Sequence, residues 1–362
     1  MRGLPPVSPG DPCVSEPEKI QLAHGGGGRR TRALLDRLFL PAFENPALAR
    51  RHDSAVLSIV QELSLPQAPG GGSARIAFTT DSFVVSPLFF PGGDIGRLAI
   101  CGTVNDLAMA GAEPRWLSAG FILEEGLEVA LLERIVSSMR AAAREAGVEV
   151  VTGDTKVVDR GKGDGAFIAT SGIGIVPGGL DISPARVRPG DAILVSGDVG
   201  RHGIAILSVR EGLIFEGDVT SDVAPLASLA SAVLASGAEV HCFRDLTRGG
   251  LATALIEIAL DGRAAIEVEE RDVPVNGAVS GACEILGLDP LYVACEGRFV
   301  AFVSEESAGR ALAAMRAHPL GQGAARIGSV GSDRPGTVRL HARSGGSRPL
   351  DLLSGEQLPR IC

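Results

Sequence analysis

The chain has 362 residues, a net charge of −9 and a sequence pI of about 5.3. This acidic balance argues against a nucleic-acid surface, because phosphate backbones are bound by clustered Lys and Arg. Hydrophobic residues make up 45% of the chain and charged residues 21%, which indicates a folded protein long enough for two domains. No run approaches the ~18 apolar residues that cross a bilayer, and the six cysteines show no CxxC spacing. We expect a cytoplasmic protein with reduced thiols and neither a membrane nor a nucleic-acid partner.

The first half of the chain alternates between predicted helices and strands. Five prolines mark residues 1–23 as a loose leader. Apolar residues between Leu127 and Ala146 recur at steps of three and four, which predicts one buried face of an amphipathic helix. The other expected elements are helices over residues 31–43 and 102–112, and strands over 57–65, 75–79, 148–154 and 166–177.

The second half repeats the alternation after a connection at residues 183–191 that is punctuated by Pro and Gly. Apolar segments at 291–295 and 298–304 are predicted to be paired strands, and residues 343–348 a flexible joint. The other expected elements are helices at 204–209, 225–236 and 251–260, and strands at 192–197, 238–243 and 264–270. The fold class is therefore mixed α/β (α+β). Its predicted parts are the leader, an N-terminal domain at 24–182, a C-terminal domain at 183–343 and a mobile tail at 344–362.

Acidic and amide residues in the first half follow apolar strands or lie in a helix of small residues. They are Asp81, the pair Asn105 and Asp106, and Asp154 with Lys156 beside it. Carboxylates and amides without His or Cys suit a hard cation such as Mg²⁺, which also takes phosphate oxygens as ligands. Each Asp could instead cap a helix or a turn, and for a single position the two interpretations have equal weight.

Three glycine clusters could bring backbone N–H groups close to phosphate oxygens. They are His24–Gly28, Pro91–Gly96 and Asp245–Gly250, and the last two precede expected helices. None matches the P-loop pattern, and no GxGxxG follows a first strand. The sequence therefore predicts neither a P-loop nor a dinucleotide-binding unit.

The chain ends in Cys362, a thiol that a chain terminus cannot readily bury. It is not a prenylation signal, which needs the Cys four residues from the end. Only Arg360 among its sequence neighbours could lower the thiol pKa, and the terminal carboxylate should raise it. The 17 residues from Gly346 to Cys362 would reach roughly 55 Å when extended. We expect a movable thiol that a partner, more than this chain, makes reactive.

Four stretches together resemble the HypE family of hydrogenase maturation proteins. They are "TTDSFVVSPLFFPGGDIGRLAICGTVNDLAMAGAEP", "GDTKVV", "RDLTRGGLAT" and the terminal "LPRIC". That family belongs to a superfamily of ATP-using enzymes with aminoimidazole ribonucleotide synthetase, selenophosphate synthetase and thiamine-monophosphate kinase. The resemblance covers residues 24–362, and the terminal "PRIC" separates this family from its relatives.

The resemblance implies a fold of the aminoimidazole ribonucleotide synthetase type, a homodimer formed through the N-terminal domains, and Mg-ATP in a cleft. In such a family the carbamoyltransferase HypF first carbamoylates the C-terminal Cys. The protein then dehydrates the thiocarboxamide to a thiocyanate. The cyano group passes to iron held by HypC and HypD, as a ligand of the [NiFe]-hydrogenase centre.

The resemblance also implies roles for single residues. Cys362 carries the substrate, Asp81, Asp106 and Asp154 hold Mg²⁺, and Lys156 offsets charge on the transferring phosphoryl group. Glu296 is the expected base and His202 a further catalytic residue, although each matches one family motif only and His202 could equally be structural. The expected nucleotide-binding residues are Asp81, Asn105, Asp106, Asp154, Asp245, Arg248 and Gly249. At position 295 the chain has Cys where the family has Asn, so a buried thiol is the simplest interpretation there.

Two other functions stay open. The first is an ATP-dependent ligase or kinase acting on a free small molecule, which would not need Cys362. The second is a non-catalytic scaffold whose tail thiol carries a ligand, which would not need to bind Mg-ATP.

Overall fold

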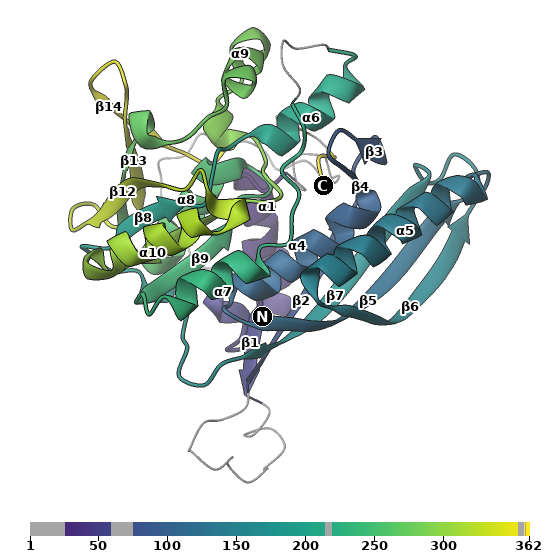
Figure 1. Ribbon diagram of the computed structural model, residues 1–362, viewed down its shortest axis with the longest axis horizontal. Coiled ribbons are helices and arrows are strands. Elements are labelled where there is room, and N and C mark those ends of the chain that lie inside the picture. Colours follow the sequence, from purple (N-terminus) through teal and green to yellow (C-terminus); the bar gives the residue numbers. More distant parts are fainter. Residues whose placement is uncertain (1–25, 59–74, 214–218, 354–357, 359) are drawn as a thin grey trace, which may run out of the picture.

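The computed structural model describes residues 26–58, 75–213, 219–353, 358 and 360–362. The leader predicted at 1–23 lies outside these residues, as does most of the strand predicted at 57–65. Two mixed α/β domains lie side by side, each built on one large sheet (Figure 1). No helix in the described part of the chain is long and apolar enough to cross a membrane.

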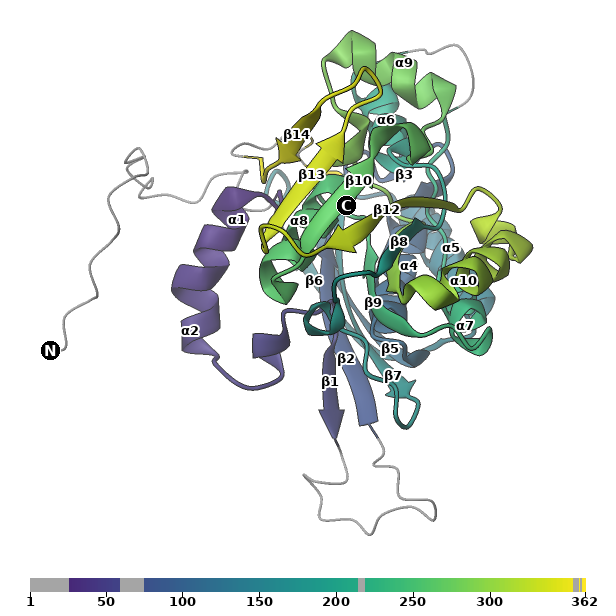
Figure 2. The same cartoon turned by 90° about the vertical axis from the view of Figure 1, so that its left-hand side faces the viewer.

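A helical run at the N-terminal side confirms the helix predicted at 31–43. It consists of α1 (Arg29–Leu34), a π-helical turn η2 (Leu35–Phe39) and α2 (Leu40–Ala42). The run lies along the second domain (Figure 2), where Arg32 Nη2 is 2.6 Å from Asp261 Oδ1. At its start, the Arg29 N–H donates to the Leu353 carbonyl oxygen at 3.0 Å, so this run also contacts the C-terminal part of the chain.

The first sheet has five strands in the order β1-β2-β7-β5-β6. The strands are β1 (Ala55–Ser58), β2 (Arg75–Phe83), β5 (Glu113–Glu124), β6 (Glu149–Val158) and β7 (Ala166–Val176). Only β5 and β6 are parallel, and α5 (Val129–Ala146) connects them, as a parallel pair requires. The amphipathic helix predicted over 127–146 is confirmed.

Helix α4 (Ile95–Met109) covers the same face of this sheet as α5 (Figure 1). Small residues allow its close approach, because a Cβ at Gly96 would come within 2.5 Å of the Ile135 carbonyl oxygen. Asp94 caps α4 by accepting hydrogen bonds from the N–H groups of Gly96 at 2.7 Å and Arg97 at 3.2 Å. The cluster Pro91–Gly96 forms this cap and the hairpin β3 (Phe89–Phe90) and β4 (Gly93–Asp94), so the N–H groups of Ile95 and Gly96 are already bonded within the protein.

The second sheet has seven strands in the order β14-β13-β10-β12-β8-β11-β9. They are β8 (Ala192–Val195), β9 (Val240–Asp245), β10 (Ala265–Glu269), β11 (Phe299–Val303), β12 (Ala325–Gly331), β13 (Thr337–His341) and β14 (Ser347–Leu350). The helices of this domain are α6 (Arg201–Arg210), α7 (Ala227–Ala235), α8 (Gly250–Gly262), α9 (Gly277–Leu286) and α10 (Glu305–Ala317).

Two predictions in the second half are wrong. Residues 291–295 do not pair with 298–304, because Pro290–Tyr292 forms a 3₁₀ turn and β11 pairs with β8 and β9 instead. Residues 343–348 are not a flexible joint, because β13 and β14 form an antiparallel hairpin that continues to the buried Leu350. The ordered sheet therefore extends further toward the C-terminus than the sequence indicated.

The two domains share apolar cores. Ala108 and Met109 of α4 pack with Leu226, Phe243 and other residues of the second domain. In the other direction, Ile206 of α6 and Ala294 pack into the cluster under the first sheet, which also includes Ile361. The interface is buried and apolar, and it fixes the position of residues that meet across it.

Candidate active site

A cavity of about 240 Å³ lies where the two domains meet. The first domain contributes residues from the end of β2 and from α4, and the second contributes the turn between β9 and α8. The charged lining residues are Asp53, Asp81, Asp106, Arg244, Asp245, Arg248 and Glu257. Five carboxylates therefore face two guanidinium groups.

Burial and mutual repulsion disfavour the ionised forms of the carboxylates in this cavity. Burial, followed by the charges of Asp245, Asp81 and Asp53, raises the pKa of Asp106 well above its ordinary value. Burial also raises the pKa of Asp81, against the opposing charge of Arg248. A cation placed among such groups would favour their ionised forms. The set of oxygen donors thus fits a hard cation such as Mg²⁺, which usually binds one or two carboxylates together with substrate phosphates.

Arg244 and Asp53 form the base of the cavity. Arg244 Nε is 3.0 Å from Asp53 Oδ1, and its Nη1 is 3.2 Å from Glu257 Oε2. Burial raises the pKa of Asp53 to about 6, although the charge of Arg244 opposes this. The second oxygen, Asp53 Oδ2, is buried and has no hydrogen-bond partner in the described part of the chain. An enclosed carboxylate oxygen without a partner is a second feature that fits a bound cation or its water.

The last residues of the chain lie beside this cavity in contact with both domains. The Val84 N–H donates to the main-chain oxygen of Cys362 at 3.0 Å, and the Ser86 N–H donates to the Arg360 oxygen at 3.3 Å. Arg210 of α6 reaches the same Arg360 oxygen with Nη2 at 2.8 Å. Arg360 itself forms an ion pair with Asp164. These bonds fix the position of the tail backbone against both domains.

His202 binds the tail directly. Its Nε2 is 2.7 Å from the Ile361 carbonyl oxygen, and its Nδ1 is 2.8 Å from Ser221 Oγ. Because a carbonyl oxygen can only accept, Nε2 carries the proton in this arrangement. Burial lowers the pKa of His202, against the effect of the Ile361 carbonyl, so the neutral ring is favoured. His202 therefore contacts the tail backbone.

The thiol of Cys362 packs beside the apolar cluster under the first sheet. Burial raises its pKa; Arg248 lowers it, and Glu296, Asp81 and Asp245 raise it further. From the sequence, Arg360 was the neighbour expected to lower the pKa of this thiol. In the structure Arg360 forms an ion pair with Asp164, and the cation that lowers the pKa of Cys362 is Arg248. The free thiol in this position is biased toward its protonated form, and its activation by a partner stays a prediction.

Glu296 lies on the same side, in a buried loop between residues 295 and 298. Burial and the charges of Asp245, Asp81 and Asp222 raise its pKa well above the ordinary value. Its Oε1 has no hydrogen-bond partner among the described residues. The neighbouring Cys295 is a buried thiol that accepts a hydrogen bond from the Gly200 N–H at 3.1 Å. The thiol at this position therefore makes a polar contact although it is buried.

Some of the predicted residues do not line the cavity. Asp154 and Lys156 form an ion pair of 2.6 Å on the edge strand β6, and both side chains are 70% exposed. Among the described residues, no group of three His, Cys, Asp or Glu side chains could hold a metal, so Asp81, Asp106 and Asp154 do not meet within this chain. Gly249 starts α8 with a φ of +76°, and its neighbour Gly250 lines the cavity instead.

Asn105 is buried and faces the second domain. Its Nδ2 donates to the oxygens of Ala224 at 3.1 Å and Glu296 at 3.3 Å, while its Oδ1 accepts from the Leu226 N–H at 2.7 Å. These bonds use both N–H donors of the amide group. Asn105 therefore supports the loop that carries Glu296, and it leaves no donor free for a nucleotide.

Sequence reasoning missed several residues of the site. Arg244 had a detectable signal, since it is a cation inside the apolar strand "VHCFRD" directly before Asp245. Asp53, Glu257 and Arg210 had none, because their spacing in the sequence gives no hint of the cavity or the tail that they contact. Asp222 also had no motif of its own.

Fold and site together define the class of proteins related to AIR synthase. The family model described as "AIR synthase related protein, N-terminal domain" matches residues 51–176, and the corresponding C-terminal domain matches residues 188–341. Within this class, the carbamoyl dehydratase HypE of Azotobacter vinelandii is 54% identical over 343 residues, covering 95% of this chain and 97% of the relative. The chain belongs to the HypE family of carbamoyl dehydratases.

Solved structures agree with this assignment. A structure described as a HypE-HypF complex matches with a TM-score of 0.80 and 43% identity, covering 89% of this chain and 100% of the other. A HypE structure in complex with ATP matches with a TM-score of 0.77 and 50% identity, covering 95% of this chain and 100% of the other.

Proposed function

We propose that this protein uses ATP to dehydrate a carboxamide on its own Cys362. The reaction converts R–S–C(=O)–NH₂ and ATP to R–S–C≡N, ADP and phosphate. The carboxamide oxygen leaves with the phosphate, and the two N–H protons leave as the C≡N bond forms. The observation that carries this proposal is the tail, because its backbone bonds to Val84, Ser86 and His202 hold the thiol within the charge environment of the cavity.

Phosphoryl transfer depends mainly on positioning and charge neutralisation. Arg248 interacts electrostatically with Asp81, Asp106 and the Cys362 thiol. A cation in this position suits a contact with phosphate or with the developing imidate. One or two of the cavity carboxylates, such as Asp81 and Asp106, would hold Mg²⁺ together with phosphate oxygens, directly or through water. When bound, Mg²⁺ supplies charge neutralisation for the phosphates.

Glu296 is the base that we assign to proton removal. Its raised pKa makes a strong proton acceptor once the group is ionised, and its Oε1 has no competing hydrogen bond among the described residues. The neutral His202 positions the tail. The role in catalysis that the sequence predicted for His202 is therefore one of holding the carbonyl of Ile361.

A second copy of the chain would bring Asp154 and Lys156 into the site. The face of the first sheet that α4 and α5 leave open carries large exposed apolar side chains, namely Phe78, Trp116, Ile122 and Ile175. An apolar face of this kind favours an interface with another protein. A homodimer through this face would also cover β6, so that its ion pair could contact the nucleotide of the other subunit.

The carbamoyl group needs a donor enzyme, and the cyano group needs an acceptor. The solved HypE-HypF complex supports HypF as the donor enzyme. We propose the HypC-HypD complex as the acceptor, in a reducing cytoplasm that keeps the tail thiol free. The seated tail disfavours a free small molecule as substrate, since Cys362 occupies the position next to the cavity.

Mass spectrometry of the C-terminal peptide tests this function. After incubation with HypF, carbamoyl phosphate and ATP, Cys362 should gain a carbamoyl group that then loses one water. An adduct on another cysteine, or an adduct that never loses water when ATP is present, would contradict the proposal. The Cys101→Ser variant, which alters a cysteine buried in α4, is a control for the site of the adduct.

A further inference from the structure

The segment from Ser221 to Ala224 crosses from the second domain to the first. The Ser221 N–H donates to the Pro91 oxygen at 2.8 Å. Arg97 Nε donates to the Val223 oxygen at 3.2 Å, and Asn105 Nδ2 donates to the Ala224 oxygen at 3.1 Å. The first domain therefore holds this segment at three points, residues 221, 223 and 224.

The side chain of Ser221 faces the tail. Its Oγ accepts a hydrogen bond from the Val223 N–H at 3.1 Å, so the single hydroxyl proton is available for His202 Nδ1 at 2.8 Å. A proton donated to Nδ1 leaves the imidazole proton on Nε2. That proton bonds the Ile361 oxygen at 2.7 Å. Ser221 thus fixes the tautomer of the residue that holds the tail.

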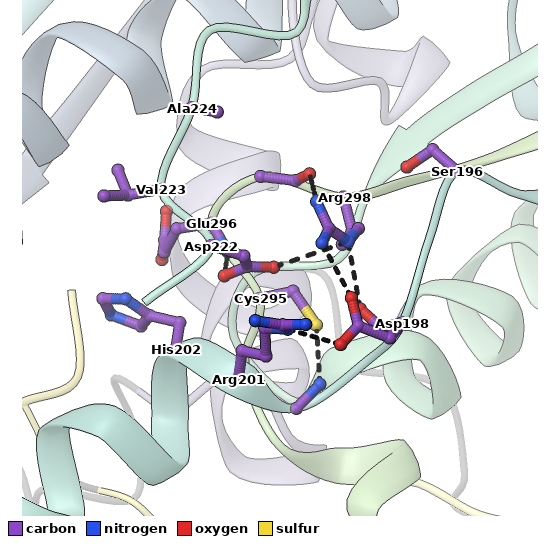
Figure 3. A network of polar contacts seen from close by, with 12 residues as sticks. Ser196, Asp198, Arg201, His202, Asp222, Val223, Ala224, Cys295, Glu296 and Arg298 are labelled. Atoms are coloured by element: carbon purple, nitrogen blue, oxygen red, sulfur yellow. Dashed lines mark hydrogen bonds and ion pairs between the residues drawn. The ribbon is translucent and has the colours of Figure 1, made fainter. Parts of the chain in front are cut away.

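The side chain of Asp222 faces Glu296 (Figure 3). Its side chain is 0% exposed, and Oδ1 accepts from the Glu296 N–H at 3.0 Å. Its Oδ2 lies 4.0 Å from Arg298 Nε and has no hydrogen-bond partner among the described residues. The two backbones also approach closely here, because a Cβ at Gly297 would lie 1.8 Å from the main-chain oxygen of Asp222.

Arg298 is fixed in turn by Asp198. Arg298 Nη2 donates to Asp198 Oδ1 at 2.8 Å, and Arg298 Nε donates to the main-chain oxygen of Asp198 at 3.0 Å (Figure 3). Arg201 pairs with the other oxygen of Asp198. Asp222 therefore lies between the ion network of Arg298, Asp198 and Arg201 and the backbone of Glu296. A buried carboxylate is costly to maintain unless its oxygens are bonded, and Oδ1 is bonded to the Glu296 N–H.

We propose that Ser221 and Asp222 are positioning residues that fix the substrate tail and the Glu296 carboxylate relative to each other. One acts on Cys362 through His202, and the other acts on the loop of Glu296. Because the two are adjacent in one segment held by the first domain, a shift of either partner is resisted by the same backbone. This inference rests on the proposed role of Glu296.

The main test is the rate at which the carbamoylated protein loses water after ATP is added, followed by mass spectrometry in a single turnover. Asp222→Ala should slow this step by about 10- to 100-fold, since misplacement by an ångström costs up to about that much. Asp222→Asn keeps an oxygen for the Glu296 N–H and should restore the rate to within about threefold of the wild type. Asp289→Ala is the matched control, because Asp289 also accepts a backbone N–H at 3.0 Å and contacts an arginine, but outside the site.

A double variant separates positioning from a general structural effect. If Asp222 acts through Glu296, then adding Asp222→Ala to Glu296→Gln should slow the step by less than about twofold beyond Glu296→Gln alone. Full additivity would overturn the proposal, as would an Asp222→Ala rate equal to that of Asp289→Ala. Glu296→Gln with wild-type turnover would instead overturn the base assignment, and with it the part of this proposal that concerns Asp222.

The Ser221 arm uses a readout that does not depend on Glu296. Ser221→Ala should increase the rate of alkylation of Cys362 in the presence of ATP by about threefold or more, because loss of a hydrogen bond costs about 1 kcal/mol. Asp222→Asn should leave this labelling rate unchanged. Ser208→Ala is the control, since the hydroxyl of Ser208 bonds only the Ala205 oxygen within α6 among the contacts described. Equal labelling of the Ser221→Ala and Ser208→Ala proteins would overturn this arm.

Discussion

The Nε2 atom of His202 lies 2.7 Å from the carbonyl oxygen of Ile361, one residue before the end of the chain. This bond joins α6 of the second domain to a backbone that also pairs with residues 84 and 86 of the first. A histidine near a helix start is thereby part of the binding surface for the protein's own C-terminus.

His202→Ala should release the tail. The variant loses the donor to Ile361, so Cys362 should react with iodoacetamide several-fold faster in the presence of ATP. The upper limit is about tenfold, which corresponds to 1.4 kcal/mol. His202→Gln retains an N–H donor and should lie between the two. Unchanged labelling of the Ala variant would mean that the bond does not hold the tail in solution.

Cys362→Ala should abolish turnover and leave ATP binding intact. The thiol is beside the cavity but is not among the residues that line it, so the nucleotide contacts survive. Equilibrium binding of Mg-ATP and the release of phosphate in the presence of HypF and carbamoyl phosphate measure the two properties. Turnover that persists in this variant would favour a free small molecule as substrate. Absence of Mg-ATP binding in the wild type would favour a scaffold.

Lys156→Ala and Asp106→Asn should complement each other in mixed dimers. If Lys156 serves the cavity of the other subunit, then a dimer with one copy of each variant has one intact site. Each variant alone should be inactive, and the co-expressed mixture should regain a measurable fraction of the wild-type rate. Failure to regain activity, with mixed dimers present by mass, would contradict a shared site.

Two glycine substitutions should have opposite effects. Gly297→Ala forces a Cβ to within 1.8 Å of the Asp222 oxygen, so the two loops must separate, and both turnover and melting temperature should fall. Gly309→Ala in α10 has nothing within 4 Å and should raise the free energy of unfolding by about 0.5 to 1 kcal/mol. Urea denaturation measures the free energy of unfolding of both variants. A Gly297→Ala protein as stable and active as the wild type would show that the close approach is relaxed in solution.

His52 should make the protein less stable in acid. Burial, followed by the charges of Arg244 and Arg50, lowers its pKa to about 3, whereas the unfolded chain takes up this proton near pH 6.5. Below pH 6.5 the unfolded state therefore binds more protons, and stability falls as the pH decreases toward 3. His52→Gln should remove about 2 kcal/mol of the loss between pH 7 and pH 5. Parallel stability curves of variant and wild type over that interval would contradict the shift.

Periodicity and punctuation predicted much of the fold. The apolar residues of α5 recur at helical spacing because one face of the helix is buried, and the apolar runs of β7 and β11 are those of buried strands. These patterns therefore predicted the correct secondary structure. Residues 291–295 misled the prediction, since "LYVAC" is apolar for a different reason. It packs as a turn under α8, where Leu291 and Tyr292 are buried.

The site was predictable only where a motif carries it. Asp81, Asp106, Asp245 and Arg248 come from recognisable stretches, and the structure brings them to one cavity. The tail contacts were not predictable, because Arg210 and Asp164 lie far from residue 360 in the sequence. Asp154 and Lys156 illustrate a third case, in which a motif is present but its residues lie exposed on the edge strand β6, away from the cavity of the same chain.

The hairpin of β13 and β14 limits where the thiol can travel. Leu350 is buried in the sheet, and Leu353 is bonded to Arg29, so nine residues, 354–362, remain to carry Cys362 away from the protein. Fully extended, nine residues span about 30 Å, little more than half the reach that the sequence suggested. An enzyme that loads or unloads this sulfur must therefore bring its own catalytic centre to within that radius of Leu353, and the geometry of delivery is set by how closely the two proteins dock.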